Sequence, residues 1–126
     1  MMIPKKVKKI KKSTIKNKCD KLFSLQVREI GVCELAGKDN IHCGGNLQCA
    51  HIDTRGKHAI RWNRKNAVCL CSGHHVWYTN NPGAWDKIVK KEFPAKFKFV
   101  EKHQSDIWDK DIEKVYDGLV DRIGMI

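Results

Sequence analysis

The sequence predicts a small α+β protein in which helices at both ends flank a short-stranded, metal-stapled centre. Apolar residues recur at helical spacing near the N-terminus and again near the C-terminus. Between them, residues 32–50 are rich in glycine and cysteine and poor in helix formers. Such a segment has little core of its own and usually needs a staple such as a metal ion.

The chain divides into a basic arm and one domain. Residues 1–12 offer little apolar surface to offset the entropy of ordering, so we expect a disordered arm there and a single domain over 13–126. A first helix is predicted over residues 14–30, with Ser13 and Thr14 capping its start and Gly31 ending it. Cys19 falls on the apolar face of this helix.

Two short strands and three further helices are expected after the first helix. Residues 46–51 predict one strand, and a second is expected near residues 59–62 after a loop. A helix is predicted to begin near Cys71 and another at Pro82, ending before Pro94. The last helix is expected over residues 105–123, with a core-facing stripe made of Ile107, Trp108, Ile112, Val115, Tyr116, Leu119 and Ile123.

Positive charge is concentrated at the N-terminal end. The chain has 25 Lys and Arg against 14 Asp and Glu, and nine lysines with one aspartate lie between positions 5 and 21. A terminal basic run is typical of an arm that binds phosphates, and it favours DNA or RNA over a small neutral metabolite. Alternatively, the basic run is a solvated tail that only keeps the protein soluble. The arm lysines are Lys5, Lys6, Lys8, Lys9, Lys11 and Lys12.

The sequence contains no run of about 18 apolar residues, the length needed to cross a membrane. The charges at the start have no apolar segment behind them, so a secretory signal is not expected. We therefore expect a cytoplasmic protein. Because six histidines accompany the six cysteines, and Cys71 and His74 have metal-ligand spacing, zinc is favoured over disulfides.

The segment from position 47 to position 75 contains residues suited to phosphodiester hydrolysis. His51 ends a predicted strand, Asn66 follows 15 residues later, and His75 lies 24 residues after His51. A neutral imidazole can take a proton from water, a polar partner can fix its tautomer, and another imidazole can bind a divalent cation.

Cys49-Ala-His51, Asn66 and the segment from Cys71 to His75 together resemble the HNH (ββα-metal) endonuclease motif. The segments 19–28 and 47–51 are also similar to segments of the phage NinG/Rap recombination nuclease family. The resemblance implies a ββα-metal core with a zinc knuckle, and an enzyme of a phage-infected host cytoplasm.

Roles for individual residues also follow from this resemblance. It implies that His51 is the general base, that Asn66 orients it, and that His75 binds a catalytic Mg²⁺ or Mn²⁺. Cys71 and His74 would form half of a structural zinc site, with Cys33 and Cys43 as the other half. Phosphates would be contacted by Arg55, Lys57, Arg61 and Arg64.

Several alternatives remain open at this point. Cys49 or Cys69 could replace Cys33 or Cys43, and the roles of His74 and His75 could be exchanged. Many HNH motifs have a metal ligand just before the base, where this chain has Ala50, so Asp53 or His58 could serve instead.

The expected function is metal-dependent cutting of double-stranded or branched DNA. A non-catalytic zinc-knuckle protein that binds nucleic acid is the first alternative. A metal-stapled protein-interaction domain is the second.

Overall fold

The computed structural model describes residues 12–53, 58–108 and 111–124. The expected phosphate contacts at Lys5, Lys6, Lys8, Lys9, Lys11, Arg55 and Lys57 therefore lie outside the described residues. In chain order the elements are α1 (Lys12–Arg28), β1 (Leu47–His51), α2 (His58–Arg61), the 3-10 turn η1 (Arg64–Asn66), β2 (Ala67–Cys71), α3 (Ser72–Thr79), α4 (Pro82–Glu92), α5 (Pro94–His103) and α6 (Ile112–Gly124).

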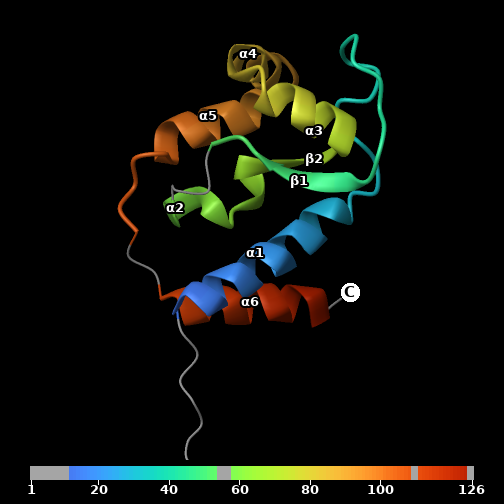
Figure 1. The fold of residues 1–126 in the computed structure, drawn as a ribbon. Coiled ribbons are helices and arrows are strands. Elements are labelled where there is room, and N and C mark those ends of the chain that lie inside the picture. Colours follow the sequence, from blue (N-terminus) through green and yellow to red (C-terminus); the bar gives the residue numbers. More distant parts are fainter. Residues whose placement is uncertain (1–11, 54–57, 109–110, 125–126) are drawn as a thin grey trace, which may run out of the picture.

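The centre of the fold is an antiparallel hairpin covered by helices on both faces. Strands β1 and β2 pair so that Cys49 lies opposite Cys69 and His51 opposite Ala67. Helices α1 and α6 lie side by side along one face, and α3 and α4 cover the other (Figure 1). Helices with a small two-stranded sheet agree with the predicted α+β class. Among the described residues, no helix is long and apolar enough to span a bilayer.

Alternation along β2 divides the core into two parts. Cys69 faces α1 and packs with Phe23 and Val27, whereas Val68 and Leu70 face the α3 side and pack with Tyr78. All five β2 residues are buried, which explains their continuous apolar run. Cys19 is also fully buried on the α1 face, as predicted.

The prediction of a second strand near residues 59–62 was wrong. Those positions belong to α2 and the residue after it, and the strand that pairs with β1 is Ala67–Cys71. A strand buried on both faces shows no alternation, so its sequence does not distinguish it from buried helix.

The C-terminal helices also differ from the predictions. Pro94 ends α4 as expected, but it also occupies the first turn of a further helix, α5, where proline's missing N–H costs nothing. Helix α6 begins at Ile112 rather than near Ser105, and Ile107 is 87% exposed instead of core-facing. Trp108 is partly buried against Trp62, with 5.6 Å between the ring centroids.

Residues 33–45, here called the knuckle, are fastened to the hairpin by backbone contacts. Glu34 donates its N–H to the Cys69 carbonyl and accepts the Cys69 N–H at its carboxylate. At the other end, the Gly73 N–H donates to the Gly44 carbonyl and the Ser72 N–H to the Asn46 carbonyl. The knuckle is therefore held against both β2 and the start of α3.

Gly45 has a conformation and surroundings that exclude a side chain. Its φ is +81°, and a Cβ there would lie 1.8 Å from the Ser72 Oγ. We expect Gly45→Ala to lower the free energy of unfolding by about 2–4 kcal/mol, because backbone strain adds to the overlap. Gly44→Ala is the matched control, since a Cβ at Gly44 meets nothing within 4 Å. Thermal denaturation that finds equal effects for the two variants would contradict this account of the knuckle.

Candidate metal centre and histidine pocket

Four side chains from the knuckle, β2 and α3 converge on one point. Cys33, Cys43, Cys71 and His74 have their ligand atoms within 4.8 Å of one another. The His74 Nδ1 lies 3.6 Å from the Cys33 Sγ, 3.6 Å from the Cys43 Sγ and 3.2 Å from the Cys71 Sγ. This Cys₃His cluster could hold a structural metal ion.

Hydrogen bonds outside the cluster orient the histidine. The His74 Nε2 lies 2.9 Å from an Asp39 carboxylate oxygen, whose partner oxygen accepts the Tyr78 hydroxyl at 2.5 Å. Burial opposes ionisation of Asp39, but the bonds from Tyr78 and His74 lower the pKa of its carboxyl. A carboxylate on the distal nitrogen is the usual arrangement for a metal-binding histidine, because it fixes the ring and leaves Nδ1 as the ligand.

Backbone donors stabilise the thiolate of Cys71. Its Sγ accepts the N–H groups of Gly44 and His74 at 3.4 Å each. Burial alone would raise the pKa of this thiol, but these bonds lower it to about 6. Because a metal binds the thiolate rather than the thiol, the knuckle prepares Cys71 as a ligand.

The geometry decides between the ligand sets that the sequence left open. Cys49 and Cys69 face each other across the hairpin and pack toward α1, away from the cluster. His74 is the histidine in the cluster, whereas His75 points to a different site. Exchange of the two histidines is therefore excluded, as is replacement of Cys33 or Cys43.

His51 and His75 lie in the wall of one pocket. This cavity of about 200 Å³ opens beside the end of β1 and the start of α4, and it is lined by Ala50, His51, Ile52, Asp53, Leu70, His75, Tyr78, Thr79, Pro82 and Trp85. The two residues that the sequence predicted to share a site therefore line the same pocket. The His51 ring also contacts Phe23 of α1, whereas His75 contacts Gln48 of β1.

Each imidazole has one nitrogen committed to an oxygen acceptor. The His51 Nε2 lies 2.8 Å from the Arg61 carbonyl, and the His75 Nδ1 lies 2.6 Å from the Gln48 Oε1. Both oxygens accept only, so these nitrogens must carry the protons. In a neutral ring of this tautomer, the His51 Nδ1 and the His75 Nε2 are the accepting nitrogens. Burial lowers the pKa of His75, which keeps its ring neutral near neutral pH.

Asn66 acts on the loop rather than directly on His51. Its Oδ1 accepts the Asp53 N–H at 2.8 Å, and its Nδ2 donates to the Ile60 carbonyl at 3.2 Å. Among the described residues, none of its side-chain hydrogen bonds goes to the His51 ring. The prediction that Asn66 orients His51 is therefore corrected: fully buried Asn66 joins the two sides of the loop that supplies the Arg61 carbonyl.

Arg61 also has a structural partner. Its guanidinium pairs with the Asp20 carboxylate at 3.0 and 2.6 Å, and the Trp62 indole N–H donates to the same carboxylate at 3.0 Å. Asp20 on α1 thereby fixes the segment whose carbonyl holds His51. Arg61 was expected to contact phosphate, but this pairing assigns it to the scaffold. Arg64 is exposed and remains available to a ligand.

The sequence did not single out Asp20, Asp39 or Gln48. Each acts on a residue at least 27 positions away in the chain, and no local pattern marks such contacts. Of the three, only Gln48 could have been suspected from the sequence, because it lies in the same strand as His51.

Comparisons with models of protein families, with curated proteins and with solved structures found no match. The geometry of the two sites therefore carries the functional argument. In the described part of the chain, the Cys₃His cluster is the only group of three or more potential metal ligands within bonding range of one another.

Proposed function

We propose that this chain is an HNH-type, metal-dependent DNA endonuclease with zinc in its Cys₃His cluster. The observation that carries the proposal is that His51 and His75 line one pocket, each with one ring nitrogen anchored to an oxygen acceptor. The division into a base and a metal ligand needs two neutral imidazoles in different hydrogen-bonded settings.

In the proposed reaction a water molecule attacks phosphorus while the His51 Nδ1 takes its proton. The bond from phosphorus to the leaving sugar oxygen breaks, and that oxygen is protonated from solvent. The His51 Nε2–H stays on the Arg61 carbonyl throughout, so the ring presents Nδ1 to the water. Loop anchoring by Asn66 and Asp20 keeps that carbonyl in place.

His75 would hold the catalytic Mg²⁺ or Mn²⁺ through Nε2. Such a cation supplies positive charge for the phosphate and for the leaving oxygen. Asp53 lines the same pocket and is the described carboxylate placed to assist His75. The side chain of His58, the other replacement considered for the ligand missing at Ala50, lies outside the described residues.

For the Cys₃His cluster, zinc is the metal that the donor set favours. Three sulfurs and one imidazole nitrogen make a closed tetrahedral set of the kind found in structural zinc sites. Because all four positions are protein ligands, such an ion would support the knuckle and take no part in the reaction.

DNA is proposed as the substrate because of charge. The net charge of +11 is concentrated in the lysine-rich arm, which suits a phosphate backbone. Arg64 adds an exposed cation in η1.

A non-catalytic, zinc-stapled DNA-binding protein is the second candidate. Ala50 at the position of a usual metal ligand favours it, as does the absence of a second three-ligand group among the described residues. It predicts binding with steep salt dependence and no turnover with any divalent cation.

Cutting of supercoiled, flapped and four-way DNA separates the two candidates. The zinc-loaded protein is incubated with each substrate with and without Mg²⁺ or Mn²⁺. Nicks that depend on the added cation support the nuclease. Salt-sensitive binding with intact DNA in every reaction contradicts it.

Asp20 is proposed as a positioning residue for His51. We expect Asp20→Asn to lower the turnover rate by about 10–100-fold, the usual effect of losing a supporting partner. The KM for DNA and the zinc content should not change, because Asp20 touches neither. Asp121→Asn, an exposed carboxylate on α6, is the control. A loss in KM alone, or equal losses in both variants, would rule out the positioning role.

A further inference from the structure

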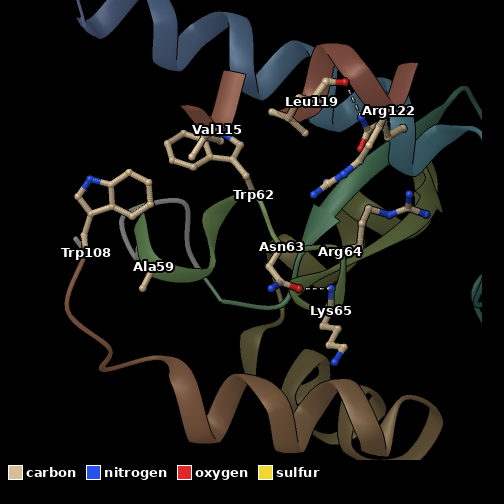
Figure 2. A pocket seen from close by; sticks show the side chains of 10 residues that line it. Ala59, Trp62, Asn63, Arg64, Lys65, Trp108, Val115, Leu119 and Arg122 are labelled. Atoms are coloured by element: carbon tan, nitrogen blue, oxygen red, sulfur yellow. Dashed lines mark hydrogen bonds between the residues drawn. The ribbon is translucent and has the colours of Figure 1, made fainter. Parts of the chain in front are cut away.

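A second cavity lies on the other side of the segment that anchors His51. It has a volume of about 420 Å³ and is bordered by α1, α6 and the segment from α2 to η1 (Figure 2). Pockets that hold small ligands are commonly about 300–1,000 Å³. This cavity is therefore large enough for a ligand, and the proposed reaction does not use it.

The cavity has an aromatic end and a cationic end. Trp62 and Trp108 lie toward one end, while Arg64 and Arg122 lie toward the other, as Figure 2 shows. Lys65 also lines the cavity, but its ammonium group lies over the Phe99 ring. Within the described residues neither arginine has a carboxylate partner. An aromatic surface with nearby unpaired cations suits a ligand that has a flat ring and a negative charge.

A buried hydrogen-bond acceptor adds an independent observation. Gln26 lines the cavity and is only 3% exposed, and its Nε2 donates to the Leu119 carbonyl at 3.1 Å. Its Oε1 has no hydrogen-bond partner in the part of the chain that the structure describes. Buried polar atoms are almost always paired, so an orphan acceptor in a cavity wall indicates a missing donor. The N–H groups on the edge of a nucleobase are donors of this kind.

We propose that this cavity is a subsite for one unpaired nucleotide of a DNA strand. The base would stack on Trp108, the less buried of the two tryptophans, because every base has a π-face, and the phosphate would lie near Arg64 and Arg122. Trp62 directly follows Arg61, whose carbonyl holds His51, so one chain segment borders the cavity and anchors the proposed base. The choice of DNA as the source of the nucleotide rests on the proposed function.

Binding can be measured without cutting. The zinc-loaded full chain, with no other divalent cation, is titrated with thymidine 5′-monophosphate, thymidine or inorganic phosphate while tryptophan fluorescence is recorded. We expect saturable binding of the monophosphate at least ten-fold tighter than of either fragment. A duplex with one unpaired thymidine should likewise bind more tightly than the fully paired duplex.

Variants assign the binding to this cavity. Trp108→Ala and Arg122→Ala should each weaken binding of the monophosphate at least ten-fold and remove the difference between the duplexes. The matched controls Trp77→Ala and Arg28→Ala, an exposed tryptophan and an exposed arginine outside the cavity, should change neither.

Three results would overturn the proposal: no saturable binding, phosphate binding as tightly as the nucleotide, or equal losses in the control variants. If the protein binds the monophosphate more tightly than its fragments but binds both duplexes equally, the nucleotide recognised by the cavity does not come from a DNA strand. If the proposed nuclease function is wrong, DNA is not cut but binding of the monophosphate to this cavity is still observed, so the two proposals can fail separately.

Discussion

His51→Ala is expected to abolish cation-dependent nicking while the protein stays folded and zinc-loaded. A positioned general base usually contributes about 10²–10⁴-fold to a rate, so the variant should lose activity on that scale. The His51 ring packs on Phe23 with 5.6 Å between centroids, but it is only half-buried, and its removal should leave the core in place. Plasmid nicking and circular dichroism measure the two halves of this prediction.

The matched control for that variant is His103→Ala. His103 is paired with Asp106 on the surface and lines neither histidine-bearing site. Its loss should leave nicking within about two-fold of wild type, since surface changes away from special features have small effects. Undiminished cutting by His51→Ala, or the same loss in both variants, would exclude His51 as the base.

Loss of the Cys₃His metal is expected to have the largest effect on stability. Structural zinc binding is worth about 10–16 kcal/mol in small zinc domains, which exceeds the typical stability of a protein of this size. Cys71→Ser should therefore release the metal and unfold the knuckle, and a strong chelator should do the same to the wild type. Metal analysis of the purified chain, followed by thermal denaturation, tests both.

Cys49→Ala is the control for the zinc prediction. Cys49 is partly buried on the α1 face of the hairpin, outside the cluster. Its removal should cost some packing energy and leave one zinc ion per chain. A wild-type protein that contains no zinc and resists chelators would refute the proposed metal site.

The spacing of Cys71 and His74 predicted half of the metal cluster, and the resemblance to HNH nucleases supplied the other ligands. Cys71 and His74 are three residues apart at the start of α3, and Cys33 and Cys43 lie in the turn-rich segment that precedes β1. The shared pocket of His51 and His75 follows from their positions in the fold, since one ends β1 and the other lies in the helix after β2.

The contacts that hold these residues in place were not predictable from the sequence. Arg61 resembles a phosphate ligand in a basic stretch, but Asp20, 41 residues away, pairs with its guanidinium. The segment 59–62 was also predicted as a strand, yet the fully buried run 67–71 takes the position beside β1. In both cases tertiary packing decides, and local patterns carry no information about it.

The most direct test of the proposed site uses paramagnetic Mn²⁺. The ion is added in substoichiometric amounts to the zinc-loaded chain while the imidazole nitrogen signals are recorded by NMR. One cation held by His75 beside His51 predicts that the signals of these two rings broaden first and together, before that of His103. Broadening of His75 without His51, or of His103 to the same degree, would contradict a shared catalytic pocket.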